Sequence, residues 1–229
     1  IVYAGDDSGY LFKSTDGGES WAFQSHYGND LASQNLALSS ATDPVTIMGT
    51  INGSMYRTLD EGESWSRVLG GSPNKYIFDI ETDPDDPLTV WATSGWPTWD
   101  YPFFGLFLST DGGATWTPTG QLVDVNVIEL MFDPWSALKM YAVGDDGFYK
   151  SADGGLTWNP AMTGLTETRV HSLASNEASP QTLFAGTRSG VFKSTDEGGA
   201  WTPAGLASHW VKALVRQPKT QGMFAGTTD

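Results

Sequence analysis

The chain has 229 residues, no cysteine and a formal net charge of −15 at pH 7, from 27 acidic and 12 basic residues. The absence of cysteine excludes disulfides and thiolate metal sites, and the acidic balance argues against nucleic-acid binding, which needs a basic surface. No apolar run approaches the length of a membrane span. Ten Trp, 27 Gly and few helix-forming stretches indicate an all-β chain with many tight turns.

Short apolar runs bounded by turn residues follow one another along the whole chain, which is typical of β-strands. Asp-Pro pairs end several of them, at Asp43, Asp83 and Asp133. In chain order we expect strands at 1–5, 10–13, 36–39, 46–49, 54–58, 77–81, 89–92, 105–109, 127–131, 139–143, 147–151, 170–174, 182–185, 190–194, 211–215 and 222–226.

One eight-residue pattern, Ser/Thr-x-Asp-x-Gly-x-x-Trp, recurs five times, at 14–21, 58–65, 109–116, 151–158 and 194–201. The Asp can accept hydrogen bonds from backbone N–H groups a few residues on, and the Gly permits a backbone conformation closed to other residues. The pattern therefore predicts a hairpin turn, after which the Trp opens another strand and buries a large apolar surface. The Asp and Trp residues with these structural roles are Asp16, Trp21, Asp60, Trp65, Asp111, Trp116, Asp153, Trp158, Asp196 and Trp201.

Successive Trp residues of the pattern lie 42 to 51 positions apart. A period of about 40–45 residues with four short strands is typical of a β-propeller blade. The repeated pattern resembles the Asp-box, or BNR, repeat of sialidases, xyloglucanases, sortilin-type receptors and photosystem II stability factors. This resemblance implies one all-β propeller domain over 1–229. It also implies that the Asp boxes are structural turns between the third and fourth strands, away from the working face.

The two ends of the chain predict how the ring closes. Ile1–Gly5 matches a second strand, and 211–215 matches the innermost strand that this blade lacks. Pairing them would give five blades, and would displace the tail after Gln217, which repeats the second strand at 222–226. The alternative is that the chain belongs to a larger propeller. Because it begins on an apolar strand without Met, we expect a mature or trimmed product, or a fragment.

The best sequence signal for binding is a loop in the third repeat. Where other repeats have a short turn, 95–104 carries five aromatic residues and two prolines. Exposed aromatic side chains mark binding surfaces, by stacking on sugars or by anchoring proteins. We expect this loop on the rim opposite the Asp boxes, although a private mini-core or a subunit contact would explain it too. The candidate ligand-binding residues are Trp96, Trp99, Asp100, Tyr101, Phe103 and Phe104.

Carboxylates suggest the rival interpretation, glycoside hydrolysis. Asp79 and Glu129 occupy one column of the innermost strands in adjacent repeats, where small residues are expected. Paired acids can act as general acid and base, but they can equally be solvated or ion-paired. Asp7 follows a Tyr-Ala strand, as a catalytic Asp does in the xyloglucanases, but the surrounding motif is absent.

Other chemistries find little support. The sialidase resemblance implies an arginine triad and an Arg-Ile-Pro motif, whereas this chain has five Arg and no such motif. His26, His171 and His209 fall near junctions between repeats and are best interpreted as independent residues. We expect no metal and no cofactor.

The sequence therefore predicts a non-catalytic binding propeller. Its expected partner is a carbohydrate or a protein, recognised through the rim opposite the Asp boxes, with no nucleic acid and no membrane insertion. We expect an extracellular or periplasmic location. The ligand and the oligomeric state are left open.

Overall fold

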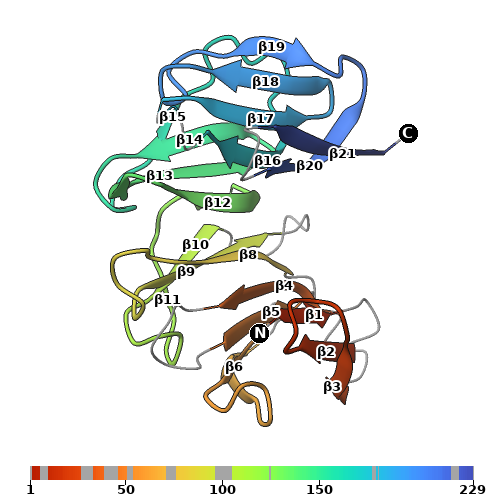
Figure 1. Ribbon diagram of the computed structural model, residues 1–229. Coiled ribbons are helices and arrows are strands. Elements are labelled where there is room, and N and C mark those ends of the chain that lie inside the picture. The colour runs from red at the N-terminus through yellow and green to blue at the C-terminus, as the bar shows by residue number, and fades with distance from the viewer. Residues whose placement is uncertain are drawn as a thin grey trace. The chain divides into compact units, whose positions relative to one another are not determined.

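A computed structural model describes residues 2–5, 10–26, 33–38, 46–50, 54–70, 76–95, 105–123, 125–176, 179, 181–217 and 222–228. These residues form antiparallel β-sheets, and this part of the chain contains no helix (Figure 1). None of its elements is a helix that could cross a membrane. The chain divides into two compact units, 1–124 and 125–229.

Unit 1 contains three sheets, of three, four and four strands. Each strand pairs with its sequence neighbour, so every sheet is a simple meander. The first sheet is β1 (Val2–Gly5), β2 (Tyr10–Ser14) and β3 (Ala22–His26), the second is β4 (Ser33–Leu38), β5 (Thr46–Thr50), β6 (Met55–Thr58) and β7 (Ser66–Leu69), and the third is β8 (Tyr76–Thr82), β9 (Val90–Gly95), β10 (Gly105–Ser109) and β11 (Thr117–Pro118).

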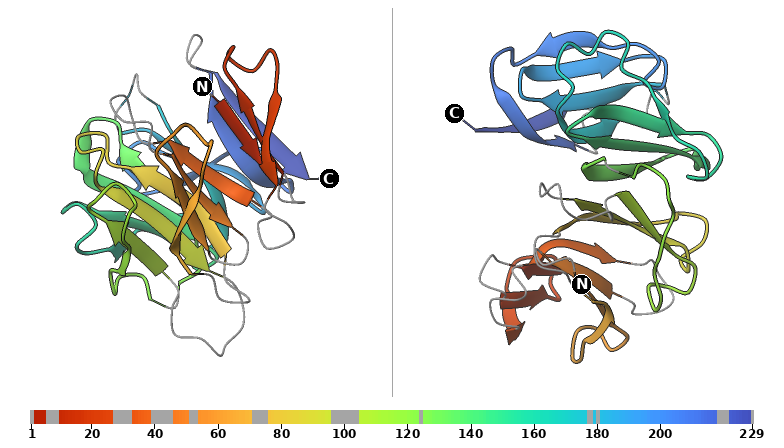
Figure 2. Two further views of the ribbon diagram at one scale, coloured as in Figure 1. Left: turned by 90° about the horizontal axis from the view of Figure 1, so that it is seen from below. Right: turned by 180° about the vertical axis from the view of Figure 1, so that it is seen from behind.

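Unit 2 contains two four-stranded meanders and one pair of strands (Figure 2). The meanders follow the same order as those of unit 1. They are β12 (Val127–Asp133), β13 (Ser136–Gly144), β14 (Gly147–Ser151) and β15 (Asn159–Pro160), then β16 (Val170–Ser175), β17 (Leu183–Thr187), β18 (Gly190–Ser194) and β19 (Thr202–Gly205), and the pair is β20 (Trp210–Arg216) and β21 (Met223–Thr228).

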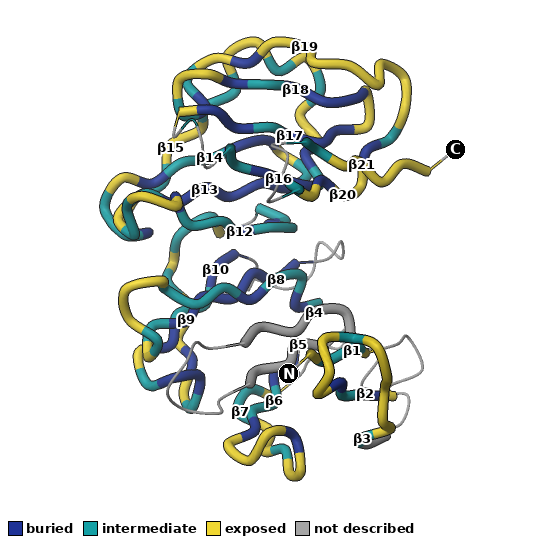
Figure 3. Tube along the Cα trace, viewed as in Figure 1, coloured by how far each residue is buried: buried dark blue, intermediate teal, exposed yellow. Residues whose placement is uncertain are grey.

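The core of unit 2 lies between its two complete sheets. Tyr141 and Phe148 of one sheet pack with Leu183, Phe192 and Trp201 of the next, and all five side chains are buried. Figure 3 shows the buried stretches of β13, β14, β17 and β18 in dark blue. Each large apolar side chain removed from water stabilises the fold by roughly 1.5–3 kcal/mol. Packing of neighbouring sheets on each other is therefore the main source of stability.

Each innermost strand of unit 2 carries a β-bulge near its start. The register shifts between Val127 and Glu129 in β12, between Val170 and Ser172 in β16, and between Val211 and Ala213 in β20. A bulge leaves one residue unpaired and turns its side chain away from the regular alternation. The extra residues in β16 and β20 are His171 and Lys212, which both reappear in the candidate site.

The expected pairing of the two ends is wrong. β20 pairs with β21 in the register Leu214↔Ala225 and Val215↔Phe224, so the tail is a strand and is not displaced. The sequence predicted five sheets, and the described residues form six. The physical reason is local: only six residues separate β20 from the copy of the second strand that follows it, and a short connection costs little entropy to close.

Candidate ligand-binding rim

The Asp boxes form the predicted turns between third and fourth strands. In all five, the side-chain oxygen of the first Ser or Thr accepts the N–H of the residue two after the Asp, at 2.8–2.9 Å. The Asp carboxylate accepts the N–H of the residue four after it, at 2.8–3.0 Å. Both acceptors stabilise backbone groups inside the turn, so the Asp is a structural residue.

A hydroxyl from the fourth residue after the Asp adds another bond in four boxes, at 2.5–2.6 Å. The fifth box has Ala200 at this position and lacks that bond. Hydrogen bonds to the charged form lower the pKa of a carboxyl group. The hydrogen bond from the hydroxyl is the largest cause that lowers the pKa of Asp60, Asp111 and Asp153 to about 2. Asp196 keeps a lowered pKa through Ser194 and the Ala200 N–H.

The residue after the Asp has a positive φ in every box. It is glycine in three boxes, at φ 65° to 77°, but Glu61 and Glu197 adopt φ 56° and 57°. Both glutamates pair with a lysine of the preceding sheet: Lys13 Nζ lies 3.1 Å from Glu61 and Lys139 Nζ lies 2.8 Å from Glu197. The strained backbone is therefore accompanied by an ion pair between neighbouring sheets.

The box tryptophans differ in burial. Trp116 and Trp201 are buried as predicted, at 9% and 2% exposure, and Trp65 and Trp158 are half-buried. The prediction is wrong for Trp21, which is 45% exposed. The Trp21 indole Nε1 donates to Gly18 of its own turn, whereas the Trp201 indole Nε1 donates to Ala161, in the connection that follows the preceding sheet.

The Asp boxes share an edge with the connections between first and second strands. The N–H after each Asp donates across this edge, from Gly112 to Leu88, from Gly154 to Leu138 and from Glu197 to Gln181, at 2.8–2.9 Å. The Asp-Pro pairs at Asp83 and Asp133, which lie at the ends of the first strands of two of these sheets, are therefore at the same edge as the Asp boxes, whereas Asp43 lies outside the described residues. At the opposite edge of unit 2 lie the turns 144–147 and 187–190 and the connections 161–169 and 205–209. We call this edge, together with the starts of β16 and β20, the binding rim of unit 2.

Several predicted site residues lie outside the described residues. They comprise the ligand-binding candidates Trp96, Trp99, Asp100, Tyr101, Phe103 and Phe104, the catalytic candidate Asp7 and the side chain of His26. Their roles stay predictions.

Asp79 and Glu129 both bind backbone N–H groups. The Asp79 carboxylate accepts from Ile80 at 2.9 Å. The Glu129 carboxylate accepts from Leu173 of β16 at 3.1 Å and so links two sheets of unit 2.

Glu81 is an acid that the sequence analysis did not single out. It lies two residues after Asp79 on β8, and regular pairing with β9 puts both on the face opposite Ile80. Burial, followed by the Asp79 charge, raises the pKa of Glu81 to about 8. Only its place beside Asp79 could have suggested it.

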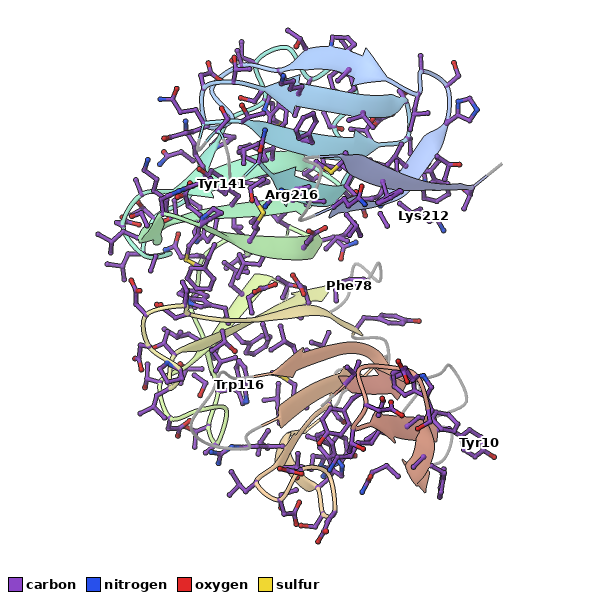
Figure 4. All side chains as sticks on the ribbon, in the orientation of Figure 1. Tyr10, Phe78, Trp116, Tyr141, Lys212 and Arg216 are labelled. Carbon is purple, nitrogen blue, oxygen red and sulfur yellow. The ribbon has the colours of Figure 1, made fainter. Side chains whose placement is uncertain are left out.

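The binding rim of unit 2 holds a cluster of positive side chains around one indole ring. The Arg188 guanidinium carbon lies 4.6 Å from the centroid of Trp210, and Lys212 Nζ lies 4.4 Å from it. Cations are attracted to the face of an indole ring by its quadrupole. Arg188 and Lys212 are exposed, and neither has an ion-pair partner among the described residues. Figure 4 labels Lys212 on β20.

His171 extends this cluster towards the preceding sheet. Its ring centroid lies 5.1 Å from that of Trp210. Burial lowers the pKa of His171; Asp145 opposes this shift, while Arg188, Lys212 and Arg169 add to it. His171 is therefore neutral at neutral pH. Asp145 accepts a hydrogen bond from Asn126 at 2.8 Å and lies 3.9 Å from the Arg169 Nε.

The cluster is incompletely hydrogen-bonded. In the part of the chain that the structure describes, the buried Nε2 of His171 and Nε1 of Trp210 have no hydrogen-bond partner. An unsatisfied buried polar atom costs about 1–3 kcal/mol. Such atoms in a native fold call for an explanation, and a functional role is one of the usual ones. We define the rim cluster as Arg188, Trp210, Lys212 and His171.

Of these four residues, the sequence suggested only His171, and only as an independent histidine. The signal that it missed is positional: His171 and Lys212 are the bulged residues of successive innermost strands. Trp210 immediately precedes the buried Val211 of β20, just as Arg169 immediately precedes the buried Val170 of β16. No group of three or more potential metal ligands occurs among the described residues.

Comparison with known proteins agrees with this architecture. A protein-family model described as BNR/Asp-box repeat matches 107–118. The repeat in this chain is the Asp box. No curated protein matches the sequence significantly.

Solved structures with the same fold include an ancestral GH74 enzyme, at 21% identity and a TM-score of 0.68 over 85% of this chain and 27% of that one. The GH74 xyloglucanase from Xanthomonas campestris is 17% identical, with a TM-score of 0.69 over 94% and 40% of the two chains. YCF48 bound to D1 peptide is 15% identical, with a TM-score of 0.64 over 90% and 66%. The chain thus spans less than half the length of these two GH74 enzymes. At these identities the likeness establishes the fold, an Asp-box β-propeller.

Proposed function

We propose that the protein is a non-catalytic binding module that recognises a protein or carbohydrate partner through the rim opposite its Asp boxes. The observation that carries this proposal is the contrast between the two edges of unit 2. The turns of the Asp-box edge are hydrogen-bonded internally, whereas the binding rim presents two cations and two buried nitrogens that have no ion-pair or hydrogen-bond partner among the described residues. Loops and edges positioned by a rigid scaffold are the usual place for binding.

The aromatic loop 95–104, which connects the second and third strands of the third repeat, is a second proposed binding element. YCF48, one protein with this fold, has been solved with a peptide bound, which supports a protein partner. We propose an extracellular or periplasmic location. We also propose a single propeller domain over 1–229 with five blades, one for each Asp box; the β20–β21 pair lies outside that count. An experimental structure with six or more blades in the ring would contradict it.

Binding is tested with glycan and protein arrays probed by the intact chain and by a Trp96→Ala/Trp99→Ala variant. We expect a defined set of ligands for the wild type and loss of part of that set in the variant. Circular dichroism confirms that the variant is folded. If the wild type binds nothing on either array, the proposal is wrong.

A second candidate, glycoside hydrolysis, is favoured by one observation. Asp79 and Glu81 share a strand face, and burial followed by the Asp79 charge raises the pKa of Glu81 to about 8, so Glu81 holds a proton at neutral pH beside a second carboxyl group. Such a pair suits general acid–base chemistry. A hydrolysis screen on plant and animal polysaccharides tests it, with Asp79→Asn, Glu81→Gln and Glu129→Gln as variants. Turnover that any of these abolishes would replace the binding-only interpretation.

A further inference from the structure

We propose that Arg188 and Lys212, held on the ring of Trp210, form a site for a single carboxylate group of a peptide ligand. The inference rests on the proposed binding function and adds the chemistry that the rim of unit 2 recognises. It is carried by three observations: the position of the two cations, the lack of a counter-charge, and the surrounding chain.

The two positive charges are fixed on one ring from different elements. Arg188 comes from the β17–β18 turn and Lys212 from the bulge of β20, and both lie within 4.6 Å of the same indole centroid. Two like charges placed at one ring repel each other, and an anion between or beside them relieves that repulsion. No described carboxylate forms an ion pair with either residue.

Asp145, an acid of the same rim, does not fill this role. Asp145 is engaged by Asn126 at 2.8 Å and lies beside Arg169 at 3.9 Å. It therefore offsets the third cation of the rim and leaves Arg188 and Lys212 as a pair. A carboxylate is the ligand that suits them, because an arginine guanidinium presents donors in a fork that matches its two oxygens.

The surroundings favour a peptide over a sugar. Sugars bind to aromatic rings by stacking on a free face, but cations already occupy the neighbourhood of the Trp210 ring. A polyanion such as polygalacturonate would be repelled at long range by the net charge of −15. Screening limits that repulsion to about 8 Å at physiological salt. A single carboxylate on an otherwise uncharged peptide therefore meets the local cations with little opposition from the rest of the surface.

The experiment uses an array of random peptides, each made with a free and with an amidated C-terminus. The intact chain is compared with an Arg188→Gln/Lys212→Gln variant. Arg67→Gln/Lys193→Gln is the matched control, since it removes the same two charges from other strands. We expect peptides selected by the wild type to carry one carboxylate, either an acidic side chain or the C-terminus, and the two forms of each peptide tell which. Binding should fall at least tenfold in the rim variant and remain in the control.

The best peptide is then titrated by calorimetry beside a counterpart in which the carboxylate is an amide. We expect at least tenfold weaker binding of the amide, and weakening of the acid, but not of the amide, as salt rises. Equal affinity for acid and amide, or unchanged affinity in the rim variant, would overturn the inference. Preference for polygalacturonate over every peptide would overturn it as well.

These outcomes separate the inference from the proposed function. Ligands found on the arrays that are lost with Trp96 and Trp99 but unaffected by Arg188 and Lys212 would preserve the binding module and reject the carboxylate site. Absence of any ligand rejects both.

Discussion

The indole of Trp201 meets the phenyl ring of Phe148 edge to face, with ring centroids 4.9 Å apart. The last Asp box of unit 2 is thereby fastened to the sheet before it, and Trp201 N–H and Nε1–H donate to Thr163 and Ala161 of the connection between them. The Asp box is thus both a turn and a connector between sheets.

Replacing Trp201 with Ala should cost about 3–5 kcal/mol of the free energy of unfolding, because it empties a buried aromatic site. The same change at Trp21, which is 45% exposed, should cost less than about 1 kcal/mol. The ring of Trp158 is half-buried, so the cost of Trp158→Ala should lie between these two. Urea denaturation of the three variants measures the order, and equal losses at all three would contradict it.

Two glycines at the same Asp-box position provide a sharper test of this contact. A Cβ added at Gly198 would lie 2.4 Å from Phe148, whereas one at Gly18 would meet only Trp21, at 3.8 Å. Both residues have positive φ, so Ala introduces backbone strain at each. Gly198→Ala should therefore be less stable than Gly18→Ala by about 1–3 kcal/mol, the usual cost of overpacking. Thermal unfolding gives the difference, and a smaller loss at Gly198 would show that Phe148 moves aside freely.

Glu197 combines an unfavourable backbone with a favourable ion pair, and three variants separate the two. Glu197→Ala keeps the positive φ and loses Lys139, so it should be the least stable. Glu197→Gly loses the pair but relieves the strain, which costs roughly 1–2 kcal/mol for a residue with a Cβ. A half-exposed ion pair contributes about 0–1 kcal/mol. We therefore expect Glu197→Gly to match or exceed the wild type. Its falling below Glu197→Ala would refute this explanation.

The sequence predicted the strands and turns well because their signals are local. Gly147–Ser151 forms the third strand with the predicted bounds, since alternation and the following Asp box define it. The fourth strands were harder: β15 begins after Trp158 and has two residues, because the Trp side chain packs while its backbone completes the turn. The pairing of β20 was misjudged because two copies of one strand pattern compete for it, and a pattern does not tell which copy is nearer.

The rim cluster could not be predicted in the same way. Arg188 sits in an ordinary turn and Lys212 in an ordinary strand, and only the bulges of successive innermost strands bring such residues to one edge. A bulge is an extra residue in the pairing of two strands, so the pattern of one strand alone does not reveal it. The aligned column of innermost strands contains Asp79 and Glu129, whereas His171 and Lys212 lie one position before that column.

The lowered pKa values of the Asp-box carboxyl groups make the stability of the fold depend on pH. The pKa of Asp60, Asp111 and Asp153 is about 2 in the fold, below the ordinary 3.8. A carboxyl group with a lowered pKa stabilises the fold fully above its ordinary pKa and ceases to do so as the pH falls through the lowered one. Stability should therefore be lost mainly between about pH 4 and 2. Ala200→Thr supplies the missing hydroxyl and should lower the pKa of Asp196 further, as carboxyl NMR can measure. An unchanged pKa would mean that the hydroxyl bond is unimportant.

Removing β21 should make the rim cluster less ordered, because β21 pairs with the strand that carries Trp210 and Lys212. β21 pairs with β20 along its length, and its first residue, Met223, packs against the buried Val211 and Leu214. Deleting 222–229 would leave the β20 backbone groups that face β21 without partners and expose this small core, so we expect faster hydrogen exchange in β20 and a less ordered Trp210. The two complete sheets of unit 2 should keep their protection, because their core lies between β13, β14, β17 and β18.

As a matched control, Phe224→Ser alters a side chain that is 61% exposed and should leave exchange in β20 nearly unchanged. Equal protection of β20 in the deletion variant and the intact chain would show that β20 stays folded without β21. The tail after Gln217 would then be dispensable for this part of the fold.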